Sequence, residues 1–354
     1  AMMLLSTTIR DPLGGSDRGL RGATLGLARS LLYEEPALLR SLVDVKPSGA
    51  SSPLHHWTPA ELAELQWEPL AAAAIDDREW VQSHAAVEGD RLVEAIDAVR
   101  RHARLEGKTL SVGDAPVDLR RQVALLPASQ AAAAVGWRRN DQLLLDEGWA
   151  DADLASDACA LPDAVLRTAV ERVGGAELAT KAARAGQIEV LDALGQLRYL
   201  SGEAVVLPGG LVTDELGRTV QALCLAQEQL SSVGAQGCAI SIGEAVPLSV
   251  EHERRVGAVL SRACAELLEG FATGLEQDEA LLLELASRPP QHEATRDELA
   301  EEARRRQGFA LRSRISRKRC LEACRAMCDA WVERPTAAGG TLRRPWKAYI
   351  RASG

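Results

Sequence analysis

Two adjacent histidines, His55 and His56, are the side chains with the clearest capacity for metal or acid–base chemistry. Imidazole nitrogen binds zinc and exchanges protons near neutral pH. A metal site needs further ligands, and no carboxylate or cysteine stands near this pair at a spacing known from zinc motifs. The sequence therefore predicts no metal site. The following residue, Trp57, favours a loop that packs its indole against the next helix.

Three cysteines, Cys320, Cys324 and Cys328, recur at intervals of four residues and would form one stripe on a helix. This spacing matches neither a zinc pair nor the usual iron–sulfur motifs, so we expect small apolar residues on a buried helix face. The seven cysteines are scattered and odd in number, which favours a reducing compartment over a disulfide framework.

A basic stretch covers residues 304–325, where nine cations accompany one acidic residue, Glu322. The cations are Arg304, Arg305, Arg306, Arg312, Arg314, Arg317, Lys318, Arg319 and Arg325. Three interpretations stay open: a solvated helix face, a surface that binds an acidic protein, and a site for RNA or DNA. The nucleic-acid interpretation is the least favoured, because the residues before 300 carry 27 Lys/Arg against 45 Asp/Glu and the aromatic share is 3%.

Residues 135–149 read Val-Gly-Trp-Arg-Arg-Asn-Asp-Gln-Leu-Leu-Leu-Asp-Glu-Gly-Trp. They keep the spacing of a known enzyme motif but differ from it at the positions that carry its function. The segment resembles Tyr-Gly-x-x-Ser-Asn-x-x-Leu-Leu-x-x-Tyr-Gly-Phe of SET-domain enzymes of the Rubisco large-subunit methyltransferase (LSMT) type. The resemblance implies that the tyrosines shape the site where a lysine amine meets the methyl group of S-adenosylmethionine. Val135 and Glu147 occupy these two positions here.

Two further regions resemble the same family. Residues 27–34 resemble its Leu-Ala-x-x-Leu-Leu-x-Glu helix, and residues 51–65 resemble its Ser-Pro-Leu-x-Trp and Glu-Leu-x-x-Leu signature. Residues 263–282 are close to the Tyr-x-Thr-Thr-Ile-Glu-Glu-Asp-x-x-Leu-Leu run of the family's C-terminal substrate-binding domain, and residues 314–321 resemble the segment that follows it. Because these motifs occur in the family's order, the chain is identified as a member of the Rubisco LSMT-like family.

The departures from the family concern its chemistry. The resemblance implies a glycine-rich strand near the N-terminus and an Asp-x-x-Asn-His segment, both of which contact S-adenosylmethionine in active members. Residues 1–20 contain no strand-like run, no Asn-His pair exists, and the single asparagine, Asn140, is expected to cap a helix. Val135 has no hydroxyl, and Glu147 would keep a lysine ammonium protonated when attack needs the neutral amine. We therefore predict no catalytic residues and no bound cofactor.

The composition predicts a mainly α fold, because Ala, Leu and Val carry the apolar fraction. We expect a reduced α+β SET-like remnant over 20–162 and an all-α substrate-binding-like domain over 163–334. We expect an irregular N-terminal segment over 1–19 before these two domains and a C-terminal tail over 335–354 after them. No run of about 18 apolar residues predicts a membrane span.

The spacing of apolar residues and the positions of helix-breaking and helix-capping residues predict the helices and strands. Thr58-Pro59-Ala60-Glu61 is a helix start with a capping box. The predicted helices are two between 20 and 43 separated by Pro36, one over 77–105, others over 163–173, 176–184, 187–198, 213–230 and 250–285, one from about 295, and a last one over 316–332. Short strands are expected at 109–112 and 122–126.

These observations predict a pseudo-methyltransferase that acts as an interaction subunit of a larger protein assembly. Its partner would be another protein, bound through the helical domain and the basic stretch, and the resemblance suggests the chloroplast. The alternatives are an active S-adenosylmethionine-dependent protein-lysine methyltransferase and a nucleic-acid-binding accessory protein.

Overall fold

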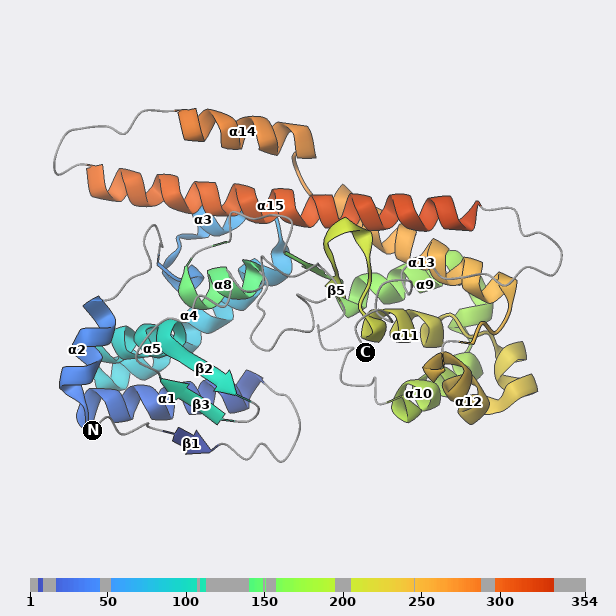
Figure 1. Ribbon diagram of the computed structural model, residues 1–354, viewed down its shortest axis with the longest axis horizontal. Coiled ribbons are helices and arrows are strands. Elements are labelled where there is room, and N and C mark those ends of the chain that lie inside the picture. Colours follow the sequence, from blue (N-terminus) through green and yellow to red (C-terminus); the bar gives the residue numbers. More distant parts are fainter. Residues whose placement is uncertain are drawn as a thin grey trace. The chain divides into compact units, whose positions relative to one another are not determined.

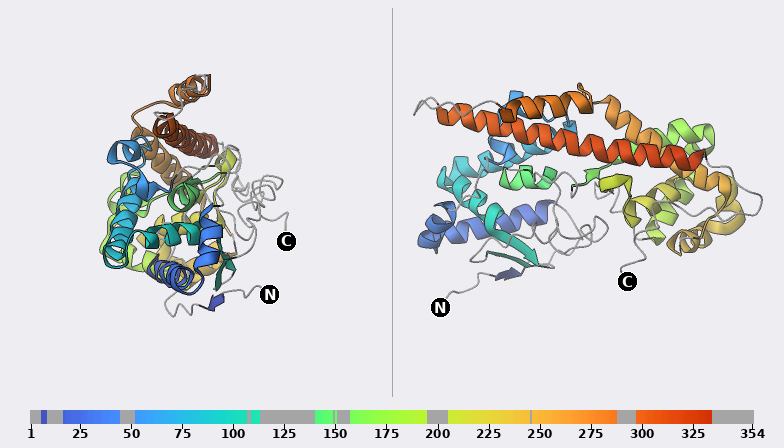
Figure 2. Two further views of the ribbon diagram at one scale, coloured as in Figure 1. Left: turned by 90° about the vertical axis from the view of Figure 1, so that its left-hand side faces the viewer. Right: turned by 45° about the horizontal axis from the view of Figure 1, so that its top comes forward.

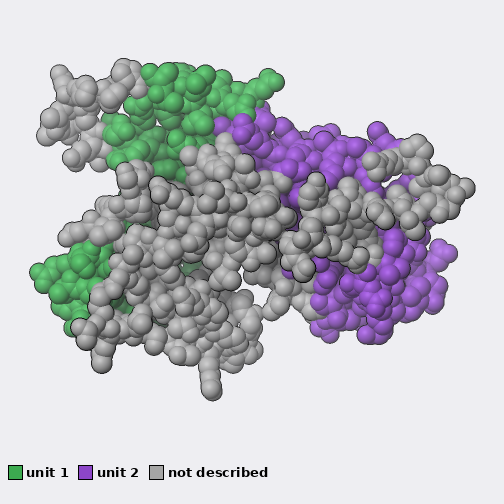
Figure 3. All heavy atoms as spheres, viewed as in Figure 1, with its two compact units in different colours: residues 1–127, 131–154, 276–314 green, residues 128–130, 155–275, 315–354 purple. Residues whose placement is uncertain are grey.

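The computed structural model describes residues 6–8, 17–44, 52–106, 109–112, 140–148, 150, 157–194, 205–244, 246–287 and 297–333 (Figure 1). This part of the chain is mainly α, as predicted. It forms two compact units, each discontinuous in sequence (Figure 3). Unit 1 comprises residues 1–127, 131–154 and 276–314, and unit 2 comprises 128–130, 155–275 and 315–354.

The helices α1 (Asp17–Tyr33), α2 (Pro36–Asp44), α4 (Glu68–Glu88) and α5 (Arg91–His102) build the core of unit 1. Pro36 begins α2, so the break predicted at this residue is confirmed. The core consists of the apolar faces of these helices: Leu25, Leu27, Ala28, Leu31, Leu39, Leu42, Val81, Leu92, Ala95, Ile96, Ala98 and Val99. Shorter elements complete the unit: η1 (Leu54–His56), α3 (Pro59–Ala63) and α8 (Asn140–Glu147).

A small antiparallel sheet accompanies these helices, in the order β1 (Ser6–Thr8), β3 (Thr109–Val112), β2 (Ala103–Glu106) (Figure 2). In the backbone register, Leu110 of β3 pairs with Thr7 of β1 and with Leu105 of β2. The strand predicted at 109–112 is confirmed, and that at 122–126 lies outside the described residues. The expectation of no strand before residue 20 was wrong, because the partner of β1 lies about a hundred residues later and leaves no local signal.

The helix predicted over 77–105 is divided in two. Helix α4 ends at Glu88, α5 begins at Arg91, and the last residues form β2. Gly89 adopts φ +91°, a backbone conformation that glycine reaches without steric cost and that ends a helix. The apolar pattern continues through this break because both helices face the same core.

Five helices form most of unit 2: α9 (Asp163–Ala179), α10 (Lys181–Ala193), α11 (Asp214–Leu223), α12 (Gln227–Gly243) and α13 (Val250–Glu269). Strands β4 (Cys159–Ala160) and β5 (Val205–Val206) pair antiparallel, and the turn η3 (Pro208–Gly210) follows β5. The predicted apolar stripe of α13 is buried through Val256, Val259, Leu260 and Ala263. All seven cysteines are buried, which confirms the packing role expected for Cys320, Cys324 and Cys328.

The C-terminal helices differ from the prediction in their breaks. The helix expected over 250–285 is interrupted between Glu269 and Leu275, where α14 (Leu275–Ser287) begins, and Gly270 and Gly274 lie in the interruption. The two helices expected after residue 295 are one, α15 (Asp297–Val332), whose residues up to Arg314 belong to unit 1 and the rest to unit 2. No described helix is long and apolar enough to cross a membrane.

Candidate functional site

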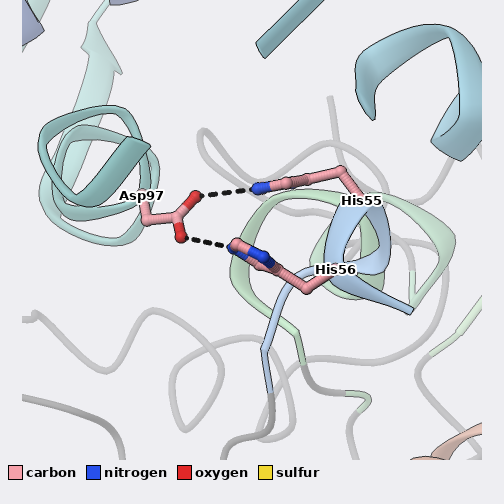
Figure 4. Close-up of side chains that lie close together, drawn as sticks. All are labelled: His55, His56 and Asp97. Carbon is pink, nitrogen blue, oxygen red and sulfur yellow. Dashed lines mark hydrogen bonds and ion pairs between the residues drawn. The ribbon is translucent and has the colours of Figure 1, made fainter. Parts of the chain in front are cut away.

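The two adjacent histidines meet a carboxylate from another helix of unit 1. Both rings come from η1, and Asp97 comes from α5 (Figure 4). His56 Nε2 lies 2.9 Å from Asp97 Oδ2, and His55 Nε2 lies 3.2 Å from Asp97 Oδ1. One potential ligand atom from each of the three side chains lies within 4.8 Å of the others. The arrangement is a donor set that could hold a metal ion, and we call it the His–His–Asp cluster.

A second carboxylate lies behind the His–His–Asp cluster. Asp77 Oδ2 of α4 is 3.4 Å from His55 Nδ1, so the ring of His55 has a carboxylate at each nitrogen. Arg100 of α5 binds both oxygens of Asp77, at 2.7 and 2.6 Å. Arg78 donates to the carbonyl oxygens of His55 and Trp57 and thereby fixes the backbone that carries the two rings. The cluster is therefore rigidly supported by α4 and α5.

Electrostatics follow from this geometry. Burial lowers the pKa of His55, but the carboxylates of Asp77 and Asp97 beside its two nitrogens outweigh burial and raise that pKa above its ordinary value. Burial raises the pKa of Asp77, but His55 and Arg100 outweigh it and lower that pKa to about 2. The pKa of Asp97 is also lowered, because contacts with His55 and His56 exceed the effect of its burial. Both carboxylates are thus ionised near neutral pH.

A pocket of about 410 Å³ lies in unit 2, where the end of α13 and the turn before α14 face the second half of α15. Its lining combines apolar and charged side chains of both signs: Leu268, Thr273, Gly274, Leu275, Lys318, Glu322, Arg325, Ala326 and Asp329. The ammonium of Lys318 is held by Thr273, at 2.7 Å from its carbonyl oxygen, and lies 4.7 Å from the ring centre of Phe271. Glu322, Arg325 and Asp329 are exposed. The pocket can therefore contact charged groups of either sign.

Comparisons with known proteins found one family and several solved structures. Residues 191–321 match the family described as Rubisco LSMT substrate-binding. Over these residues the chain is similar to Rubisco LSMT. No curated protein is significantly similar to it in sequence.

Solved structures of LSMT share the fold of this LSMT-like chain. A SET domain of LSMT bound to lysine and AdoHcy gives a TM-score of 0.55 at 15% identity, over 89% of this chain and 77% of the other. The form bound to methyl-lysine and AdoHcy gives 0.56 at 15%, over 92% and 80%. Rubisco LSMT bound to AdoMet gives 0.54 at 14%, over 88% and 74%. At these identities the likeness shows the fold.

The family positions of the LSMT-like chain can be placed only in part. Val135 lies outside the described residues, and Glu147 is the last residue of α8. The sole asparagine, Asn140, is the first residue of α8 and is 2% exposed. The sequence therefore offers no Asn-His pair to hold S-adenosylmethionine in the way that the resemblance implies for active members.

The predicted partner-binding cations of the LSMT-like chain fall into two groups. Arg314, Arg317 and Lys318 are buried, and Arg314 binds the carboxylate of Asp278. The remaining five lie at or near the surface. Among these, Arg304 donates to Leu285 O, Arg305 pairs with Glu302, Arg306 pairs with Glu61 and Glu302, Arg312 lies over the Phe309 ring, and Arg319 is exposed.

The capping box predicted at Thr58 is confirmed and is tied to one of these cations. Glu61 N–H donates to Thr58 Oγ1, and Thr58 N–H donates to the Glu61 carboxylate at 2.6 Å. Arg306 Nη1 contacts the same carboxylate at 2.9 Å. Burial raises the pKa of Glu61, but hydrogen bonds from Thr58 and Arg306 lower it overall.

Replacement of Glu61 by Gln is expected to destabilise the LSMT-like chain by about 1 kcal/mol near neutral pH, because one cap and one ion pair are weakened. A carboxylate with a lowered folded pKa stabilises the fold above its unfolded pKa and loses this effect as the pH falls through the folded pKa. The difference between wild type and Glu61→Gln should therefore shrink below about pH 4.5, the ordinary value for Glu. Urea unfolding from pH 7 to 3 measures it, with exposed Glu269→Gln as the control; a pH-independent difference would contradict the assignment.

Proposed function

We propose that this chain is a non-catalytic LSMT-like protein that binds another protein through its substrate-binding-like domain, as a subunit of a larger assembly. One observation carries the proposal: the described residues of the matched region 191–321 form packed helices, while the sequence differs from the family at the positions that, by resemblance, serve methyl transfer. The buried faces of α11 and α13 support the first half of this statement.

Methyl transfer to lysine sets strict chemical conditions. A neutral amine must point in line at the sulfonium methyl group inside a site that excludes water. Valine at position 135 supplies no hydroxyl, and glutamate at position 147 would bind a lysine as its ammonium ion and hold the proton on it. Without an Asn-His pair, the chain also lacks the residues that, by resemblance, orient the cofactor in active members.

The pocket of unit 2 supports protein binding. Apolar surface from Leu268 and Leu275 adjoins exposed charges of both signs, from Glu322, Arg325 and Asp329. Interfaces between proteins combine an apolar centre with a polar rim, whereas affinity for nucleic acid comes from an excess of cations that neutralise its phosphates. The proposed occupant is a polypeptide segment that carries both basic and acidic side chains. The family's association with Rubisco makes the chloroplast the compartment that we propose.

An active protein-lysine methyltransferase is the competing function, and the similarity to LSMT structures bound to lysine, AdoHcy and AdoMet favours it. The contacts of the basic stretch give less support to nucleic-acid binding. Arg314 and Lys318 are engaged inside the chain, and Arg305 and Arg306 are paired with acids.

Isothermal titration of the chain with S-adenosylmethionine separates the two functions. We expect no heat and no thermal stabilisation at millimolar ligand, whereas a catalytically active Rubisco LSMT in the same buffer should bind. Micromolar binding by this chain would restore the enzyme interpretation and direct attention to its target lysine.

The protein-binding half of the proposal is tested by charge reversal at the pocket. Glu322→Arg combined with Arg325→Glu should abolish co-purification of the partner that wild type retains, because both exposed charges change sign. Arg319→Glu, on the same helix outside the pocket lining, is the matched control and should keep the partner. Equal recovery with both variants would overturn docking at this pocket.

A further inference from the structure

The His–His–Asp cluster provides the donor atoms of a transition-metal site. His55, His56 and Asp97 each offer one ligand atom within 4.8 Å of the others, and both rings direct Nε2 at the carboxylate. In tetrahedral zinc sites the ligand atoms lie roughly 3.3 Å apart, because each is about 2.0–2.1 Å from the ion. The observed separations from Asp97 to the two rings, 3.2 and 2.9 Å, are close to this value.

Direct contact within the cluster leaves two buried atoms unsatisfied. His55 Nε2 and Asp97 Oδ1 are 3.2 Å apart and pair by charge, but their geometry is not that of a hydrogen bond, and neither atom has another hydrogen-bond partner in the described part of the chain. His55 is 4% and Asp97 8% exposed, so water reaches them poorly. Buried polar atoms without partners are costly, and a cation placed between them would satisfy both.

The surroundings of the first histidine match the usual environment of a metal-binding imidazole. Such a ring commonly donates its second N–H to a carboxylate, which fixes its orientation and raises its basicity. His55 Nδ1 faces Asp77 at 3.4 Å, and Arg100 holds Asp77 through both of its oxygens. Arg100 Nη1 also lies 3.3 Å from His55 Nδ1, and its charge is balanced by Asp77.

The accessibility of the His–His–Asp cluster and its charge also suit a divalent cation. The side chain of His56 is 36% exposed, whereas that of His55 is 3% exposed, so an ion can enter from the side of His56. With Asp77 and Arg100 neutralising each other, Asp97 leaves one negative charge beside a divalent ion. Two imidazoles and one carboxylate select zinc-like ions, whereas calcium and magnesium prefer oxygen ligands alone.

From this geometry we infer that unit 1 binds a zinc-like divalent ion through His55 Nε2, His56 Nε2 and the carboxylate of Asp97, with Asp77 as the outer partner of His55. The fourth position is open to water or to a ligand atom of a bound molecule, as in zinc sites with three protein ligands. This inference is independent of the proposed function.

The test uses the full chain after treatment with a chelator and its removal. Titration with Zn²⁺ should show one binding event per chain and an increase in melting temperature, and Co²⁺ should give the visible absorption of a four-coordinate nitrogen–oxygen site. His56→Asn, at an exposed ring, should weaken Zn²⁺ binding at least 100-fold. Asp77→Asn should weaken it about 10–100-fold, because only the outer partner changes.

His84→Asn is the matched control, because His84 lies on α4 of the same unit and its ring packs on Trp80 rather than on the cluster. This variant should bind Zn²⁺ as wild type does. Circular dichroism verifies that each variant is folded. The inference is overturned if wild type gives no Co²⁺ absorption, or if folded His56→Asn binds Zn²⁺ as tightly as wild type.

Discussion

Replacement of Arg314 by Met is expected to lower the free energy of unfolding by about 3–5 kcal/mol, because it leaves a buried carboxylate without its cation. Arg314 and Asp278 are 2% and 0% exposed, and the guanidinium contacts the carboxylate at 2.7 and 3.2 Å. Arg314 also donates to Glu64 O at 2.8 Å and so connects α15 to the segment after α3. Urea unfolding followed by circular dichroism measures the loss.

Two control variants separate the buried charge from the loss of an arginine. Arg325→Met, at an exposed arginine of the same helix that is 3.7 Å from Asp329, should cost less than about 1 kcal/mol. The double variant Arg314→Met with Asp278→Leu should regain much of the stability, since no unpaired charge stays buried. If Arg314→Met and Arg325→Met lower the free energy of unfolding equally, the buried pair of Arg314 and Asp278 stabilises the fold no more than an exposed ion pair does.

Replacement of Gly210 by Ala is expected to destabilise unit 2 by about 2–5 kcal/mol, the sum of a backbone cost and a steric cost. Gly210 has φ +82°, a conformation unfavourable for residues with a Cβ. A Cβ at this position would lie 2.4 Å from the backbone of Ala323 and Cys324 in α15. Because a helix backbone cannot move aside as a flexible side chain can, η3 would have to shift from α15.

The neighbouring glycine provides the control for Gly210. Gly209 has φ +74°, and a Cβ there would meet nothing within 4 Å. Gly209→Ala should therefore show the backbone cost alone, about 1–2 kcal/mol. Thermal and urea unfolding of both variants isolates the contact with α15, and equal losses would show that η3 is not closely packed on this helix.

Local patterns predicted much of the secondary structure. The capping box at Thr58, the break at Pro36 and the buried stripe of α13 depend on residues within a few positions of one another. The errors occurred where one apolar periodicity continues through a break, as at Gly89, or where a strand pairs with a distant one, as β1 does with β3. A side-chain period shows which face is buried, and it gives no information on where the backbone turns.

The candidate site was also predicted only where its residues are close together in the sequence. From the sequence, His55 and His56 were candidate metal ligands, and we predicted no metal site because no third ligand stands near them in the chain. Asp97 is 41 residues from His56 and reaches it because α5 and η1 both pack against α4. A signal was present: Asp97 is an acidic residue in the middle of the apolar run Ala95, Ile96, Ala98 and Val99 of α5, all of which are buried.

The sequence by itself determined the mainly α class, the resemblance to the Rubisco LSMT family, and the residues that stand at the positions which this resemblance assigns to the family's tyrosines. These features are residue identities and short periods, which exist before folding. Only the tertiary structure decided which charges are buried, for example that Lys318 binds Thr273 while Arg319 faces solvent. It also decided that the two histidines share a carboxylate. The reason is physical: the environment of a charged side chain is set by elements that pack against it from elsewhere in the chain.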